Sequence, residues 1–144
     1  MAEDYVELWD DFSITFNEKL INANGDWNKL SETEQEIAAL WKLVADVYNG
    51  GFIQFFCNWG FDCFVCAMRG IKRVGCAEAY SLLNNAYYSV LDKFKDDERL
   101  EEYWDIPEYL TEEDDNILME TDTAFWEGVG DRLCEAAYKF YCKK

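Results

Sequence analysis

The sequence predicts an all-α protein, folded as one compact acidic domain of about six or seven helices over residues 1–144. Apolar residues recur at steps of three and four along most of the chain, which is the spacing of one helix face. No segment keeps the alternation of apolar and polar residues that is typical of a strand. Half of the residues are hydrophobic and 17% are aromatic, so the chain has enough apolar area to bury a core.

The first two predicted helices are marked by an apolar stripe and by a capping signal. The first begins near Tyr5 and stops at Asn24-Gly25, which supplies a left-handed turn. The second begins at Ser31, because Ser31 and Glu34 have the spacing of a capping box. The two stripes are Tyr5, Leu8, Trp9, Phe12, Phe16 and Leu20, then Ile37, Leu40, Trp41, Val44 and Tyr48.

A glycine-rich and aromatic stretch, residues 49–58, interrupts the helical pattern, and we call it the corner. We expect Asn49 and Gly50 to leave the second helix with positive φ, and Gly51 to let a new helix start at once. The phenylalanine rings should turn into the core, while Gln54 and Asn58 should bond backbone groups freed by the turn. The residues of this structural motif are Asn49, Gly50, Gly51, Phe52, Gln54, Phe55, Phe56 and Asn58.

Helical spacing resumes after the corner. We expect a third helix over residues 61–73, a fourth over 77–94 and a short one over 97–104. Thr111 followed by four acids indicates an N-cap with favourable charges in the first turn. The inward side chains of the fourth helix should be Tyr80, Leu83, Tyr87 and Leu91, and the final helix should carry Phe125, Trp126, Val129, Leu133, Ala137, Phe140 and Tyr141.

The net charge of -17 limits the possible partners. Such a charge repels nucleic acid and anionic membrane surfaces, so a partner recognised by charge should be a basic protein. The N-terminus has no signal-peptide pattern, and no apolar run approaches the roughly 20 residues of a membrane span. We therefore expect a cytoplasmic protein with no direct nucleic-acid binding and no membrane contact.

The residue types argue against catalysis. The chain has no histidine, which removes the commonest general base and metal ligand. The glycine pair Gly50-Gly51 follows a helix and lacks the Lys-Ser/Thr ending of a phosphate-binding loop. Carboxylates are abundant, but they fall mainly on predicted solvent faces, where nothing raises the pKa of a catalytic acid. We expect no enzyme activity and no cofactor.

The cysteines leave one structural alternative open. Cys63 and Cys66 form half of a zinc-ribbon pattern, and Cys57 and Cys76 flank them, but a second closely spaced pair is missing. Reduced, buried thiols without a metal are the favoured interpretation, because nothing in the sequence indicates an oxidising compartment. A zinc-stabilised structural domain remains the alternative.

Acid is concentrated near the end of the chain. Residues 92–122 hold fourteen Asp and Glu against three Lys and Arg, whereas residues 37–91 hold three acids and four bases. Carboxylates three or four residues apart on a helix have Cβ atoms about 5–6 Å apart, which is comparable with successive phosphates of a nucleic-acid strand. An acidic helical face is therefore a candidate imitation of a duplex edge. The candidate partner-binding residues are Asp4, Asp11, Asp97, Glu98, Glu101, Glu102, Glu108, Glu112, Asp115 and Glu120.

The corner also carries a family resemblance. The sequence NGGFIQFF, followed about twenty residues later by VGC, resembles the signature of a bacterial domain family of unknown function that includes a DNA-mimic protein. The resemblance covers about residues 40–88. It implies an all-α, dimeric protein whose characterised relative presents acidic side chains in place of DNA phosphates and occupies the DNA-binding face of a transcription factor. The motif residues themselves are expected to be structural.

Three functions remain open from the sequence. The first is a non-catalytic DNA mimic that covers the basic face of a DNA-binding protein such as a transcription factor. The second is an immunity protein or antitoxin that neutralises a basic toxin, because the same field would serve it. The third is the zinc-stabilised domain. A shared partner with the characterised relative does not follow from the resemblance, because this chain is shorter and carries the cysteine cluster.

Overall fold

Helices make up the architecture of the computed structural model, which describes residues 4–142. The α-helices are α1 (Tyr5–Asn22), α2 (Glu32–Gly50), α3 (Phe52–Val74), α4 (Ala77–Ala86), α5 (Glu112–Ala124) and α6 (Gly130–Ala137). Three 3-10 segments are η1 (Trp27–Lys29), η3 (Asp92–Phe94) and η4 (Tyr103–Tyr109). Three π-helical segments, η2 (Tyr87–Leu91), η5 (Phe125–Val129) and η6 (Tyr138–Cys142), continue α4, α5 and α6. No strand occurs within residues 4–142, so the predicted all-α bundle is confirmed.

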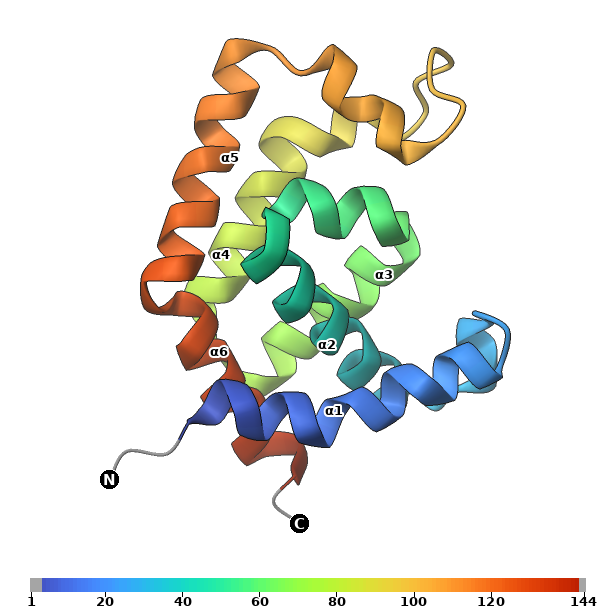
Figure 1. Ribbon diagram of the computed structural model, residues 1–144, viewed down its shortest axis with the longest axis vertical. Coiled ribbons are helices and arrows are strands. Elements are labelled where there is room, and N and C mark those ends of the chain that lie inside the picture. The colour runs from blue at the N-terminus through green and yellow to red at the C-terminus, as the bar shows by residue number, and fades with distance from the viewer. Residues whose placement is uncertain (1–3, 143–144) are drawn as a thin grey trace.

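The helices form a bundle around a central pair (Figure 1). α2 and α3 make the most extensive contact, because α3 turns at its middle and its second half runs back beside α2. α4 packs beside α3, and α5 runs along one side of the molecule. α1 crosses one end and contacts α2 and α6, while the segment around η4 lies at the opposite end. Among these helices, none joins sufficient length to sufficient apolar content for crossing a bilayer.

Aromatic rings fill the core, as the composition predicts. Phe52, Phe55 and Phe56 of the corner are almost completely buried. Phe64 stacks on Tyr87 with ring centroids 4.0 Å apart, and Phe56 lies against the same tyrosine. Each buried ring removes a large apolar area from water, which stabilises a domain of this size. The inward direction predicted for the phenylalanines of the corner is confirmed.

Most predicted helix ends are confirmed. Asn24 and Gly25 take positive φ after α1, and Gly75 ends α3 in the left-handed conformation. Ser31 accepts a hydrogen bond from the backbone N–H of Glu34, and the Glu34 carboxylate accepts one from that of Ser31. Thr111 caps α5 in the same way with Asp114. These signals depend on neighbours within four residues, so they could be found in the sequence.

Several local predictions were wrong. Gly50 is the last residue of α2, and the chain leaves that helix at Gly51, whose φ is 91°. Tyr80 of α4 is exposed instead of buried. The predicted final helix is divided by a kink at Gly128 inside η5, and Trp126 and Phe140 lie partly in solvent.

The predicted helix over residues 97–104 is also wrong. Residues 95–102 form turns, and a 3-10 helix begins at Tyr103. The Asp97 carboxylate accepts the backbone N–H of Arg99, and the Asp105 carboxylate accepts those of Glu101 and Glu102. These local bonds compete with helical ones. Like charges four residues apart would further destabilise a helix here.

Candidate functional site

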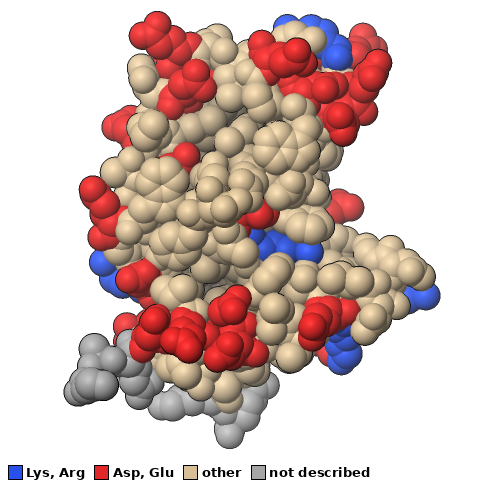
Figure 2. All heavy atoms as spheres, viewed as in Figure 1, with Lys and Arg blue, Asp and Glu red and all other residues tan. Residues whose placement is uncertain are grey.

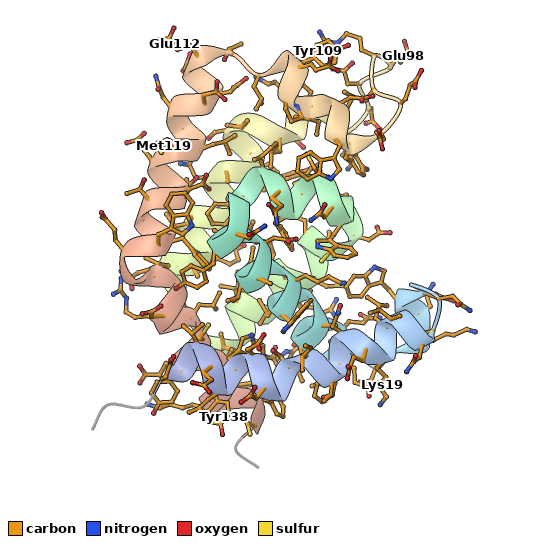
Figure 3. The ribbon with its side chains drawn as sticks, viewed as in Figure 1. Lys19, Glu98, Tyr109, Glu112, Met119 and Tyr138 are labelled. Carbon is orange, nitrogen blue, oxygen red and sulfur yellow. The ribbon has the colours of Figure 1, made fainter. Side chains whose placement is uncertain are left out.

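The candidate acidic residues lie at two ends of the molecule. Figure 2 shows acidic side chains at both ends of one face, with a largely uncharged middle between them. Five exposed glutamates come from the segment at one end, where Figure 3 labels Glu98 and Glu112. We call this group the acidic end: Glu98, Glu101, Glu102, Glu108 and Glu112. Asp4 and Asp11 are exposed at the other end of the molecule, just before and on α1 (Figure 1).

The remaining candidates lie between or beside these groups. Asp115 and Glu120 are exposed along α5, which leads away from the acidic end. Helical spacing of three or four residues survives in the pair Glu112 and Asp115. Residues 97, 98, 101 and 102 precede η4 and are not helical, so their carboxylates do not have the regular spacing that the sequence suggested.

Within residues 4–142, nine of the ten candidate carboxylates carry a charge that no ion pair compensates. Asp97 is the exception, because both its oxygens accept hydrogen bonds from the Arg99 guanidinium, the shortest at 2.6 Å. These bonds and the backbone N–H of Arg99 lower the pKa of Asp97 to about 2. None of the other nine forms an ion pair within 4.0 Å with another residue of the range 4–142. Their charges remain available to a partner.

Contacts with the corner hold the acidic end in place. Tyr103, at the start of η4, packs its ring against Phe56, and its carbonyl accepts a hydrogen bond from the Cys57 thiol. A Cβ atom at Gly60 would lie 2.6 Å from the Tyr103 ring, so only glycine allows this close approach, and its φ of 76° also favours glycine. Arg99, already paired with Asp97, stacks on Tyr109 with 4.1 Å between guanidinium and ring centroid. The acidic end is therefore an ordered surface.

The polar residues of the corner bind side chains and not the freed backbone groups that the sequence led us to expect. Gln54 donates to the Asp46 carboxylate at 3.0 Å, and Asn58 donates to the same oxygen at 3.3 Å. The Asn49 side chain donates to Gln54. The Asp46 carboxylate, in the last turns of α2, therefore accepts hydrogen bonds from Gln54 and Asn58, and Asn49 is joined to it through Gln54.

The start of α3 is capped from a distant part of the chain. The Asp122 carboxylate on α5 accepts the backbone N–H of Phe52 at 2.9 Å. A Cβ atom at Gly51 would overlap that carboxylate, so glycine is required for the approach as well as for the positive φ. Asp122 lies in the acid-rich region of the sequence, yet it is buried and structural.

The sequence analysis did not identify three tryptophans near the corner as surface residues. Trp59, Trp104 and Trp126 are each partly exposed. Their indole N–H groups donate to acceptors in the corner or just before it in α2, namely Asn58 for Trp104, Asp46 for Trp59 and the Val47 carbonyl for Trp126. Their positions do not share one helix stripe, so periodicity could not group them. Tryptophan next to acidic residues, as in EEYWD and FWEG, was the only available signal.

The cysteines do not form a metal site within the described part of the chain. Cys57, Cys63, Cys66 and Cys76 are buried free thiols, and nowhere in residues 4–142 do three potential ligands of the histidine, cysteine or acidic type come together. Burial raises the pKa of Cys57 to about 12 and that of Cys63 well above its ordinary value.

Comparisons with known proteins add one finding. Searches of curated proteins and of solved structures returned no match to this chain. A scan against family models matched residues 28–143 to the model described as DMP19-like protein. The matched range contains the corner, α2 to α6 and the acidic end, and it leaves out α1.

Proposed function

The chain belongs to the DMP19-like protein family, and we propose that it is a non-catalytic DNA mimic that occupies the basic nucleic-acid-binding face of another protein. The observation that carries this proposal is the acidic end: five exposed carboxylates that form no ion pair with residues 4–142. Fixed negative charges attract a basic face and speed its encounter with the chain.

The order of the acidic end supports mimicry more than simple solubility. Solubility requires charge but no fixed arrangement. Here η4 is fixed to the corner through Tyr103, and the preceding loop is closed by Arg99 between Asp97 and Tyr109. A surface held in place before binding loses less conformational entropy when a partner binds.

The proposal has further parts that follow from charge and resemblance. The partner is a basic protein, such as a transcription factor, and the chain makes no direct contact with nucleic acid or membrane, because its charge repels both. It acts in the cytoplasm without a cofactor, and as a homodimer, as the resemblance of the corner motif implies. The proposed mechanism makes and breaks no covalent bond.

An immunity or antitoxin role is the second candidate, because the same charges would attract a basic toxin. The two functions differ in what displaces the partner. A DNA-binding protein held through its DNA-binding face is released by duplex DNA, whereas a toxin held elsewhere on its surface is released by salt alone.

The test is affinity capture from an extract of the organism that encodes the chain, with elution by duplex DNA at constant ionic strength and then by salt. Two variants of equal charge change are compared: Glu98, Glu101 and Glu102→Gln at the acidic end, and Glu7→Gln, Asp10→Asn and Glu18→Gln on α1, none of which is a candidate partner-binding residue. We expect to recover a DNA-binding protein that duplex DNA releases. The acidic-end variant should retain about tenfold less of it, because each negative charge that faces the basic surface of the partner contributes to the attraction.

The α1 variant should retain the partner nearly as well as the unchanged protein. Recovery of a basic toxin that DNA does not release would favour the second candidate. Equal retention by the unchanged protein and the acidic-end variant would remove mimicry by this surface.

A further inference from the structure

We propose that the partly exposed tryptophans Trp59, Trp104 and Trp126, which we call the tryptophan surface, anchor arginine side chains of the basic partner. The inference rests on the proposed function, since it names the contact by which the partner is held. It assigns the tryptophan surface to the centre of the interface and the acidic end to its rim.

Hydrogen bonds hold the three indoles near the C-terminal turns of α2. The Trp59 indole N–H donates to the Asp46 carboxylate at 2.6 Å, and that of Trp126 donates to the backbone carbonyl of Val47, the next residue, also at 2.6 Å. The Trp104 indole N–H donates at 2.9 Å to Asn58, which itself donates to Asp46. Residues from α3, η4 and η5 therefore meet at the C-terminal turns of α2.

Each indole nevertheless leaves much of its ring in solvent. The exposed fractions are 42% for Trp59, 46% for Trp104 and 43% for Trp126. Since the N–H groups are already bonded within the chain, the rings offer faces and edges to a partner. Tryptophan contributes strongly to protein interfaces, and a ring fixed before binding loses little entropy on contact.

The surroundings select a cation as the occupant. A carboxylate is close to each tryptophan, because Asp105 directly follows Trp104, Glu127 directly follows Trp126, and the Trp59 indole bonds the Asp46 carboxylate. The chain itself already places a cation on one of these rings, because the Lys42 ammonium lies 3.4 Å from the Trp59 ring centroid. A ring face in a negative field attracts positive charge.

Arginine fits this surface better than the other possible occupants. Its planar guanidinium stacks on aromatic rings and sheds water more easily than an ammonium does. The contact of Arg99 with Tyr109 shows the same pairing within this chain. A second copy of the chain would bring its own charge of -17 against the acidic rim, which is unfavourable.

The test measures binding of two capped ten-residue peptides that alternate glycine with arginine or with lysine. The unchanged full chain should bind the arginine peptide about tenfold more tightly, because the guanidinium stacks on the rings and loses its water more easily than the lysine ammonium does. The double variant Trp104→Ala and Trp126→Ala should lose the preference while binding the lysine peptide within about twofold of the unchanged chain. Phe140→Ala is the matched control, because Phe140 is as exposed as Trp104 at 46%.

The outcomes separate this inference from the proposed function. Loss of arginine preference in the tryptophan variant alone supports the inference, and an unchanged preference in that variant overturns it. If the variant Glu98, Glu101 and Glu102→Gln binds both peptides as tightly as the unchanged chain, the proposed role of the acidic end is rejected, whatever the tryptophan variant shows.

Two controls keep the result interpretable. Circular dichroism checks folding, and a second variant with phenylalanine at both positions keeps a ring if alanine unfolds the chain. Sedimentation is measured on the same samples, because a dimer that dissociates only in the tryptophan variant would show that a second copy covers this surface and would overturn the inference.

Discussion

Asp122 is an acidic residue with a structural role, and it does not contribute to the exposed negative surface. Its carboxylate is buried and accepts the N–H of Phe52, the first residue of α3, whose N–H has no partner within the helix. Burial raises the pKa of Asp122, and the hydrogen bond from Phe52 only partly opposes that effect. The acceptor oxygen makes the hydrogen bond at this position, whereas burial works against the negative charge.

Removing the acceptor should therefore cost more than removing the charge. Asp122→Ala should lower the free energy of unfolding by about 1–2 kcal/mol, the usual loss for an N-cap, whereas Asp122→Asn keeps an acceptor oxygen and should lose clearly less. Urea denaturation followed by circular dichroism measures both. Glu120→Ala, an exposed neighbour on α5, serves as the control and should change little. Equal losses for the alanine and asparagine variants would contradict the capping role.

At the scale of elements, Glu36 joins α2 to α3 and to the end of the chain. Its buried carboxylate accepts hydrogen bonds from Arg69 at 2.6 Å, from Arg73 at 2.8 Å and from the Tyr141 hydroxyl at 2.7 Å. Burial by itself would raise the pKa of Glu36, but the bonds from Arg73, Tyr141 and Arg69 outweigh it, and the pKa is lowered from its ordinary value of 4.5.

The lowered pKa of Glu36 predicts how its contribution to the free energy of unfolding depends on pH. A carboxylate whose folded pKa lies below its unfolded one stabilises the fold above the unfolded value, and the contribution is lost as the pH falls through the folded value. Glu36→Gln should lower the free energy of unfolding at pH 7 by about 2 kcal/mol, as for hydrogen bonds to charged groups. The two arginines are partly exposed to water, so the larger loss of a fully buried pair is not expected.

Urea denaturation at pH 7 and at pH 3 measures the effect of Glu36→Gln. The difference between the variant and the unchanged protein should shrink at the lower pH, because pH 3 lies below the unfolded pKa and protonation of the unfolded carboxylate removes part of the contribution. Glu120→Gln, which is exposed and forms no ion pair within residues 4–142, provides the baseline. A difference that is the same at both pH values would show that Glu36 acts through packing alone.

At the scale of the whole molecule, the net charge of -17 acts against compactness. Salt screens repulsion between exposed charges, with a Debye length of about 10 Å at 0.1 M. We therefore expect the unfolding temperature to rise by several degrees between about 10 mM and 300 mM sodium chloride. The variant Glu98, Glu101 and Glu102→Gln should show a smaller rise, because it repels itself less.

Thermal unfolding followed by circular dichroism measures this dependence, and sodium and potassium chloride should give the same curve if screening is the cause. An unfolding temperature that does not change with salt would mean that the exposed charges, at the acidic end and on α1, lie too far apart to destabilise the fold by repulsion. Separation of the ends is visible in Figure 1, where α1 and η4 lie at opposite ends of the bundle.

The sequence by itself determined most of the helices and the sign of the net charge. The capping pairs Ser31–Glu34 and Thr111–Asp114, the turn at Asn24-Gly25 and the apolar stripes are local features, because each depends on residues within one or two turns. Net charge is a sum over residues and needs no fold. The family resemblance pointed to a bacterial domain family, and the match to residues 28–143 supports that much.

Only the tertiary structure decided how these parts make surfaces. Asp122 meets Phe52 across 70 residues, and Trp104 meets Asn58 across 46, so no spacing rule relates them. The same holds for the acids, because the path of the chain brings residues 98–112 to one end and carries Asp4 and Asp11 to the other. Local periodicity fixes which side of a helix is apolar, but packing between helices fixes which exposed side chains become neighbours, and that depends on contacts distant in sequence.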